Sequence, residues 1–246
     1  MDYAVSSNTL NGKVILVTGA GAGIGKQAAL SYAQHGATVI LLGKTVKKLE
    51  QTYDEIEAAG FTQPAIIPLD MKGASKQNYL DMVDTIESQF GRLDGVLHNA
   101  GALGVISPFD QIEETLFDEV MQVNVKASFL MTQALLPLLK HSDDARIIFT
   151  SSTVGHQGRA FWGAYAMSKF ATEGMMQIIA DEYSDSNIRI NAINPGGTRT
   201  AMRASAFPAE DVNQLKTPLD IMPLYVYLMA PESKAVHGQC IDAQPK

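Results

Sequence analysis

Apolar residues along the chain gather in short β-branched runs, and a longer stretch with helical periodicity separates each run from the next. The first run, KVILVT, is followed at once by glycines. Near-continuous apolar runs of this length are typical of parallel strands that helices cover on both faces, because few of their side chains then meet water. Seven strands are predicted: Lys13–Thr18, Thr38–Leu42, Ala65–Leu69, Leu93–His98, Arg146–Thr150, Ile188–Ile193 and Gly238–Asp242.

The stretches between the runs predict helices. They span Gly25–His35, Val46–Ala59, Ser75–Phe90, Glu113–Lys140, Ala164–Tyr183 and Pro218–Met229. This alternation, without a linker or internal repeat, indicates an α/β fold: one Rossmann-type, doubly wound domain over residues 1–246, with a seven-stranded parallel sheet flanked by helices on both faces. The segment 201–216 has weak periodicity, and long loops of this kind are often lids or binding segments.

Composition narrows the functional classes. The chain has 246 residues and a net charge of −7 without a long block of one sign, which disfavours nucleic acid and anionic membranes as partners. No apolar run is long enough to cross a membrane, and the polar N-terminus does not resemble a signal peptide. Cys240 is the only cysteine, so we expect no internal disulfide and a reducing compartment, the cytoplasm. The histidines lack metal-ligand spacing, and we expect no metal site.

A glycine-rich turn, TGAGAGIG at residues 18–25, follows the first predicted strand and opens the first predicted helix. Glycine lets the backbone approach a pyrophosphate, whose charge the free N–H groups of a helix start stabilise. Glycine turns also occur for packing alone, and the spacing of Gly19, Gly23 and Gly25 is not the standard G-x-G-x-x-G. The place of the turn in the first strand–helix unit favours a dinucleotide site.

The end of the second predicted strand bears on the choice of dinucleotide. An acidic residue at this point binds the ribose 2′-hydroxyl of NAD, whereas this chain has Lys44, with Lys47 and Lys48 close behind. An ammonium there favours the 2′-phosphate of NADP(H), and the lack of a carboxylate removes a repulsion. The other interpretation is that these lysines are the solvated first turn of a helix. We expect NADP(H), with NAD(H) as the alternative.

Tyr165 and Lys169 are four residues apart on a predicted helix and therefore share one side of it. A tyrosine phenol has a reference pKa of about 10, too high for a base near neutrality, and a neighbouring ammonium favours its phenolate form. The pair is chemically sensible as a proton-transfer unit, although Y-x-x-x-K alone is a frequent coincidence.

Taken together, these motifs resemble the short-chain dehydrogenase/reductase family over essentially the whole chain. They occur in the family's order: TGAGAGIG at residues 18–25, HNAG at 98–101, Asn124, Ser152, YAMSK at 165–169, and Pro195-Gly196. Long strings such as LDGVLHNAG and WGAYAMSKFATEGMMQ resemble the YciK-type oxidoreductases of bacteria in particular. The family usually has asparagine where this chain has His98, and we expect that side chain to pack or hydrogen-bond behind the site.

The resemblance implies a role for each motif residue. Tyr165 would be the general acid/base, Lys169 would stabilise the phenolate and hold the nicotinamide ribose, and Ser152 would hydrogen-bond the substrate oxygen, with Ser151 as the alternative serine. Asn124 would position a water that links Lys169 to solvent. The cofactor would be held by Thr18, Gly19, Gly21, Gly23, Ile24, Gly25, Lys44, Asp70, Asn99, Ala100, Gly101, Tyr165, Lys169, Pro195, Gly196, Thr198 and Thr200.

The sequence therefore predicts an NADP(H)-dependent oxidoreductase that transfers a hydride between the nicotinamide and a small carbonyl compound or secondary alcohol. A 3-oxoacyl thioester is one candidate substrate, and the segment 201–216 occupies the family's usual substrate lid. Within it, Arg203 would meet an anionic substrate group or lie in solvent. Phe161 and Trp162, just before Tyr165, would line the cleft or simply pack. The rival hypothesis is a catalytically silent NAD(P)-binding sensor or scaffold. The resemblance also implies a homodimer or homotetramer, formed through the helix 164–183 and the long helix before it.

Overall fold

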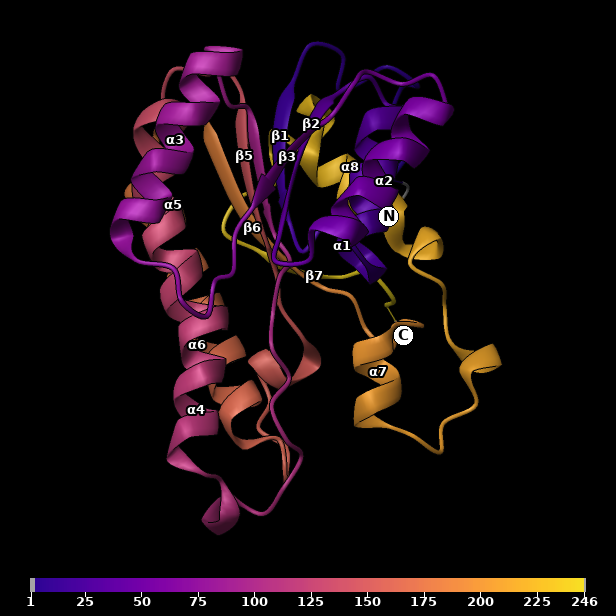
Figure 1. Ribbon diagram of the computed structural model, residues 1–246, viewed down its shortest axis with the longest axis vertical. Helices are drawn as coiled ribbons and strands as arrows, with labels where there is room; N and C mark the ends of the chain where they lie inside the picture. Colours follow the sequence, from indigo (N-terminus) through magenta and orange to yellow (C-terminus); the bar gives the residue numbers. More distant parts are fainter. Residues whose placement is uncertain (1–2, 246) are drawn as a thin grey trace.

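A seven-stranded parallel sheet, in the order β3-β2-β1-β4-β5-β6-β7, forms the centre of the computed structural model, which describes residues 3–245 (Figure 1). All seven predicted strands are present, and each pairs in parallel with its neighbours. The strands are β1 (Val14–Thr18), β2 (Thr38–Gly43), β3 (Ala65–Pro68), β4 (Gly95–His98), β5 (Ala145–Thr150), β6 (Ile188–Asn194) and β7 (Cys240–Asp242). The order reverses direction between β1 and β4, which is where doubly wound sheets bind ligands.

Helices cover both faces of the sheet, as predicted (Figure 1). One face carries α1 (Gly23–Gln34), α2 (Val46–Ala58) and α8 (Met222–Met229), and the other carries α3 (Lys76–Phe90), α5 (Ala127–Leu139) and α6 (Gly163–Glu182). Two shorter helices, α4 (Glu114–Met121) and α7 (Ala201–Ala206), lie at the lower end of the view, on opposite sides of the molecule. Within residues 3–245, no helix combines the length and apolar character that a membrane crossing requires.

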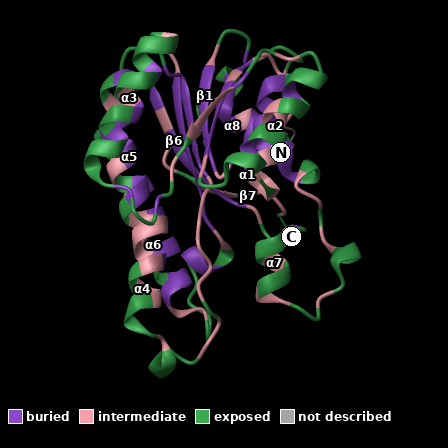
Figure 2. Cartoon of the chain, in the orientation of Figure 1, coloured by how far each residue is buried: buried purple, intermediate pink, exposed green. Residues whose placement is uncertain are grey.

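The apolar character of the strands is explained by two cores, one on each side of the sheet. In β1, Leu16 belongs to the cluster under α3, α5 and α6, while its neighbours Ile15 and Val17 belong to the cluster under α1, α2 and α8. Successive strand residues point to opposite faces, so both sets must be apolar. Figure 2 shows the result: buried strands between helices whose outward faces are exposed.

The prediction of one continuous helix over Glu113–Lys140 is wrong. The chain forms α4, then the π-helical turn Gln122–Lys126, and only then α5. Asn124 lies in this turn and bonds to two other segments, the loop at Ala102 and α6 at Ser168. Apolar periodicity does not reveal a π turn, because the turn adds a single residue to an otherwise continuous pattern, and such turns occur frequently at functional sites.

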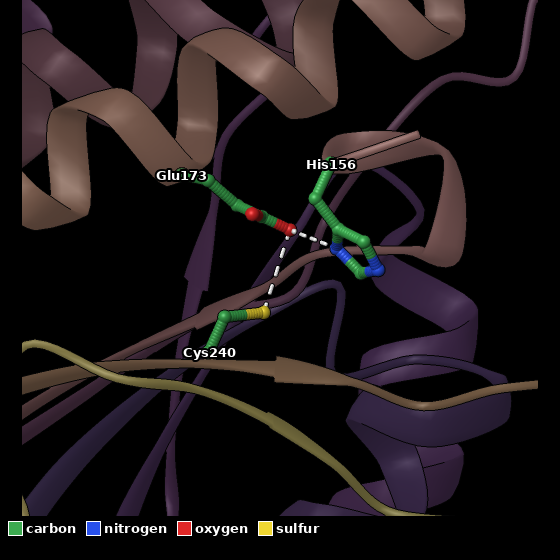
Figure 3. Close-up of side chains that lie close together, drawn as sticks. All are labelled: His156, Glu173 and Cys240. Carbon is green, nitrogen blue, oxygen red and sulfur yellow. Dashed lines mark hydrogen bonds and ion pairs between the residues drawn. The ribbon is translucent and has the colours of Figure 1, made fainter. Parts of the chain in front are cut away.

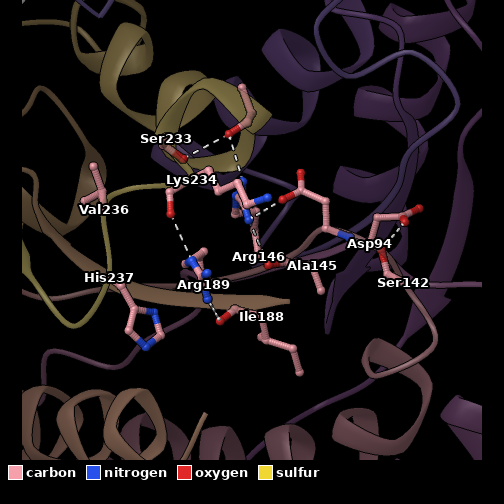
Figure 4. A network of polar contacts seen from close by, with 12 residues as sticks. Asp94, Ser142, Ala145, Arg146, Ile188, Arg189, Ser233, Lys234, Val236 and His237 are labelled. Carbon is pink, nitrogen blue, oxygen red and sulfur yellow. Dashed lines mark hydrogen bonds and ion pairs between the residues drawn. The ribbon is translucent and has the colours of Figure 1, made fainter. Parts of the chain in front are cut away.

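A buried polar network lies at the amino ends of the strands, whereas the glycine turn follows the carboxyl end of β1. Figure 4 shows part of this network, including Asp94, Ser142 and Arg146. The Asp94 carboxylate accepts hydrogen bonds from the Val14 N–H at 2.9 Å, the Ser142 hydroxyl at 2.6 Å and the Arg92 guanidinium at 2.6 and 2.9 Å. Close by, the buried Arg146 of β5 pairs with Asp144 at 2.7 Å. These charges are tolerated in the interior because each is paired.

We expect Asp94→Asn to lower the free energy of unfolding by about 2 kcal/mol at neutral pH, because buried donors lose a charged acceptor. Burial raises the pKa of Asp94, but the bonds from Arg92, Ser142 and Val14 outweigh it and hold this pKa below its usual range. Such a carboxylate stabilises the fold above its unfolded pKa, and this stabilisation is lost as the pH falls through its folded pKa.

Wild-type stability should therefore fall more steeply in acid than that of Asp94→Asn, as measured by denaturant unfolding at neutral pH and at about pH 3, below the unfolded pKa of an aspartate. Asp84→Asn is the matched control, since Asp84 lies exposed on α3. Equal losses in the two variants would contradict the role of the network.

Candidate active site

Two adjoining cavities lie along the carboxyl edge of the sheet, where the segments that follow β1 and β4 leave for opposite faces. The first, of about 330 Å³, is lined by residues that follow β1, β4, β5 and β6 and by the start of α6. The second, of about 300 Å³, is lined by residues that follow β1, β2, β3 and β4. They meet at Gly19, Ala22, Ala100 and Gly101, which line both. The result is a long groove with its middle on the glycine turn.

The glycine turn is shaped so that a ligand can approach its backbone. Gly19 and Gly23 have φ values of +69° and +55°, in the left-handed region that favours glycine. A Cβ on Gly25 would lie 2.4 Å from the carbonyl oxygen of Gly19, and one on Gly21 would lie 2.8 Å from Cβ of Lys48. Helix α1 begins at Gly23, and Ala22, Gly23 and Ile24 line the groove, so the free N–H groups of the helix start lie at it. This arrangement fits a dinucleotide with its pyrophosphate at the helix start.

Thr18 supports this turn from behind. Its hydroxyl accepts the N–H groups of Asn99 at 2.9 Å and Ala100 at 3.0 Å and lies 3.3 Å from the carbonyl oxygen of Leu97. Thr18 and Gly25 line neither cavity. Both were predicted as cofactor residues, and the structure places them in the layer that holds Gly19 and Asn99 in position. Of the other predicted cofactor residues, all line one cavity or the other.

Cations predominate at the far end of the second cavity. Lys44, Lys48 and Lys72 line it, together with the carboxylates Asp70 and Glu119. The Glu119 carboxylate is paired with Lys72 at 2.7 Å, whereas Lys44 is in no ion pair of the described residues. The end of β2 therefore presents an uncompensated ammonium to the groove, which is suited to a phosphate group.

Tyr165, Lys169 and Ser152 line one wall of the first cavity. The i, i+4 spacing on α6 brings the Lys169 Nζ to 5.6 Å from the centre of the Tyr165 ring, and Nζ donates to the carbonyl oxygen of Thr150 at 2.7 Å. Ser152 is the second residue after the end of β5. The phenol, the ammonium and the hydroxyl are thus gathered by one strand end and one helix.

Burial has the largest effect on the pKa values of Tyr165 and Lys169. It raises the pKa of Tyr165 to about 12, although the neighbouring Ser152 hydroxyl acts in the opposite direction. Burial also lowers the pKa of Lys169 to about 8, and the Glu173 carboxylate partly opposes that change. At neutral pH the phenol keeps its proton and the ammonium its charge, so the pair is prepared to give a proton to an oxygen atom bound beside it.

Asn124 is buried and does not line the cavities. Its side-chain oxygen accepts the Ala102 N–H at 2.7 Å, and its amide donates to the Ala102 carbonyl and to the Ser168 hydroxyl, both at 2.9 Å. Both N–H groups are therefore used by protein atoms. Asn124 joins the loop after β4 to the residue beside Lys169, and its role in relaying protons stays a prediction.

The two serines of the pair point in different directions. Both serines line the first cavity, and Ser152 is the serine whose hydroxyl lies beside the phenol of Tyr165. Ser151 is almost wholly buried, and its hydroxyl donates to the Glu173 carboxylate. The same carboxylate oxygen lies 3.3 Å from Nδ1 of His156 and 3.4 Å from Sγ of Cys240 (Figure 3). These contacts bring together a histidine, an acid and a thiol that are far apart in sequence, and Glu173 serves as their shared acceptor.

Sequence reasoning missed Glu173 and Gln244. An acid four residues after Lys169 on a helix that packs against the sheet was an available signal for Glu173. No local pattern indicates Gln244, whose amide donates to the carbonyl oxygens of Pro195 at 2.8 Å and Gly197 at 3.1 Å. These bonds fix the segment that carries Thr198 and Thr200.

His98 lies behind the site as expected, stacked on Phe149 with its Nε2 2.9 Å from the Thr132 hydroxyl.

Trp162 and α7 enclose the outer part of the first cavity. The Trp162 ring lies 5.8 Å from that of Tyr165 and 5.6 Å from that of Phe207, measured between ring centres. Trp162 thus both packs and lines the cavity. Arg203 also lines it, but its guanidinium is engaged by Glu210 through two contacts at 2.6 and 2.7 Å. Neither prediction for Arg203, a free substrate cation or a solvated side chain, describes this arrangement.

Comparison with known proteins gives consistent results. A family model described as short chain dehydrogenase matches residues 13–211. The uncharacterised oxidoreductase YciK of Escherichia coli is 54% identical over 245 residues, which cover 100% of this chain and 97% of the relative. The 3-oxoacyl-[acyl-carrier-protein] reductase FabG of Thermotoga maritima is 32% identical over 245 residues, or 94% of this chain and 96% of the relative.

Solved structures agree with this similarity. The crystal structure of YciK from Escherichia coli matches with a TM-score of 0.97 and 54% identity, covering 100% of both chains. A short chain dehydrogenase from Escherichia coli CFT073 complexed with NADPH matches with a TM-score of 0.96 and 54% identity, covering 98% of this chain and 100% of the other.

Proposed function

The chain belongs to the short-chain dehydrogenase family, and we propose that it is an NADP(H)-dependent oxidoreductase acting on a carbonyl compound or the corresponding alcohol. The observation that carries the proposal is the meeting of Ser152, Tyr165 and Lys169 on one wall of a groove whose middle is a glycine turn at a helix start. A dinucleotide along this groove would bring a nicotinamide to the wall that holds the proton donor.

The residues of this wall provide the proton and the charge stabilisation. The Ser152 hydroxyl would donate a hydrogen bond to the substrate oxygen as negative charge develops there. Tyr165 would transfer its phenolic proton to that oxygen, and the Lys169 ammonium would stabilise the phenolate that remains. When bound, NADPH supplies the hydride, and with it both electrons, to the carbonyl carbon. In alcohol oxidation the phenolate would instead take the hydroxyl proton.

Two observations support NADP(H) over NAD(H). Lys44 lines the groove at the end of β2, where a carboxylate would bind the ribose of NAD. A relative that is 54% identical crystallised with NADPH. A phosphate on the ribose would neutralise an ammonium that otherwise has no acidic partner.

The rival function, a sensor that binds the nucleotide without chemistry, accounts less well for the site. A sensor needs the glycine turn but not a buried phenol, whose burial raises its pKa to about 12. Nor does it need the costly burial of an ammonium beside that phenol. Reduction of a 3-oxoacyl thioester remains a prediction within the enzyme class.

We expect Tyr165→Phe to lower the rate of carbonyl reduction by about two to four orders of magnitude, because it removes the proton donor. The purified protein with NADPH and a panel of aldehydes and ketones provides the measurement, through the loss of NADPH absorbance. NADPH binding, followed by its fluorescence, should stay unchanged. Tyr183→Phe, at the end of the same helix, is the control and should retain full activity. Equal rates in wild type and Tyr165→Phe would rule out the proposed chemistry.

Lys44→Met should weaken NADPH binding by about tenfold and leave NADH binding nearly unchanged, because only NADPH carries the 2′-phosphate. Lys47→Met is the matched control, since Lys47 is exposed and does not line the groove. Fluorescence titration of both nucleotides against the three proteins measures the effect. Wild type that binds NADH as tightly as NADPH would be evidence against the assignment.

We also propose that the protein forms a homodimer or homotetramer through α5 and α6. Met167, Phe170 and Ile178 share one side of α6 and are 36%, 46% and 61% exposed, and Phe129 of α5 is 49% exposed. Exposed apolar groups collected on one face are typical of interfaces. Met176, by contrast, belongs to the core. Sedimentation should therefore give a mass of at least two chains, and Ile178→Glu should shift it toward the monomer; a monomeric wild type would contradict the proposal.

A further inference from the structure

A third cavity, of about 520 Å³, continues outward from the candidate active site. Ser152, Trp162, Gly196 and Arg203 line both this outer cavity and the cavity that holds Tyr165. A substrate whose carbonyl oxygen meets Ser152 and Tyr165 would therefore extend its remaining atoms into the outer cavity. The groups that line it would decide which substituents the enzyme accepts.

The charge of the outer cavity is opposite to that of the chain. The protein has a net charge of −7, but the outer cavity is lined by two arginines, Arg159 and Arg203, and by no aspartate or glutamate. The inner cavity also lacks acidic lining residues. A concave site with cations and no acid concentrates anions, even on an acidic protein.

Only one of the two arginines is available to a ligand. Arg203 forms its paired contacts with Glu210, and its guanidinium lies 3.8 Å from the centre of the Phe207 ring. Arg159 takes part in no ion pair among residues 3–245. Its side chain is exposed, and its guanidinium lies 5.7 Å from the centre of the Phe207 ring. An exposed guanidinium without a carboxylate partner keeps its N–H donors available to an anion.

The backbone holds Arg159 in a defined place relative to the site. The N–H of Trp162 donates to the carbonyl oxygen of Arg159 at 3.2 Å, closing a tight turn. Within the turn, Phe161 has a φ of +73°, and among the described residues no other residue except glycine has a positive φ. Its carbonyl oxygen accepts the Ser107 N–H at 3.1 Å. A bulky side chain is disfavoured in this conformation, and such positions cluster at functional sites.

We infer that Arg159 is a specificity-determining residue that binds an anionic group, a carboxylate or a phosphate, on the carbonyl substrate. The inference rests on the proposed function for the position of the carbonyl group. A guanidinium can bind either anion through two parallel hydrogen bonds. The substrate class is thus a carbonyl compound with an anionic substituent, and Trp162 packs against the atoms between the two groups.

The test compares matched pairs of compounds that differ in the anionic group. One pair is 4-formylbenzoate and its methyl ester, and the other is glyceraldehyde 3-phosphate and glyceraldehyde, so the two pairs distinguish a carboxylate from a phosphate. Wild type, Arg159→Met and Arg159→Lys are assayed for kcat/KM with NADPH. Arg199→Met is the control, because Arg199 is exposed on a neighbouring segment and lines neither cavity.

A second readout does not depend on turnover. Trp162 is the sole tryptophan of the chain, so intrinsic tryptophan fluorescence reports on this cavity. Each compound is titrated in the presence of NADP⁺, and thermal unfolding verifies that every variant is folded.

In wild type, one anionic compound should exceed its neutral partner in kcat/KM and in affinity by about tenfold or more. Arg159→Met should abolish that preference without changing the neutral compounds more than about twofold, and Arg159→Lys should restore part of it. A fluorescence preference without turnover would support the anion site and contradict the proposed function. Turnover of neutral compounds with no preference for either anion, or a preference that survives in Arg159→Met, would overturn the inference.

Discussion

The hydroxyl of Thr18 sets the distance on which the whole groove depends. It accepts two N–H groups from the loop after β4 and so ties that loop to the last residue of β1. A Cβ on Gly19 would lie only 3.1 Å from the α-carbon of Ala100, which shows how closely the two loops approach. Since β1 and β4 are neighbours whose helices leave on opposite faces, the crevice opens immediately beyond this contact. Both cavities are built outward from it.

The acid–base chemistry of the site follows from the burial of Tyr165, which is neutral when protonated, and Lys169, which is charged when protonated. Burial makes the phenol of Tyr165 harder to ionise and the ammonium of Lys169 easier to neutralise. Each group favours the charged form of the other, and the carbonyl of Thr150 holds the ammonium in place. The structure keeps this pair in register through a second layer: Asn124 bonds to the residue next to Lys169, and Glu173 bonds to the residue next to Ser152.

The chain has a net negative charge, but each end of the groove carries a positively charged side chain. Lys44 lies at one end and Arg159 beyond the other, and both lack an acidic partner within the described residues. Lys48 lines the nucleotide end together with Lys44 and is likewise in no ion pair of the described residues, whereas Lys72 is paired with Glu119 and Arg203 with Glu210. The unpaired cations therefore mark the places where anionic ligand groups would be held, one for the nucleotide and one for the substrate.

The strands of the sheet and the residues that regular elements bring together are predictable from the amino-acid sequence. Continuous β-branched runs predict buried parallel strands, and i, i+4 spacing places Tyr165 beside Lys169, because strand and helix geometry are local properties of the backbone. Tertiary structure alone decided the rest. The bonds of Asn124 in the π turn, the bond of Ser151 to Glu173, and the bond of Gln244 to Pro195 all join segments far apart in the chain. Arg203 and Glu210 are only seven residues apart, but their ion pair depends on how the chain turns after α7. Because Glu210 pairs with Arg203, it does not pair with Arg159. Such contacts arise from packing and hydrogen-bond satisfaction in three dimensions, which no periodicity of the sequence encodes.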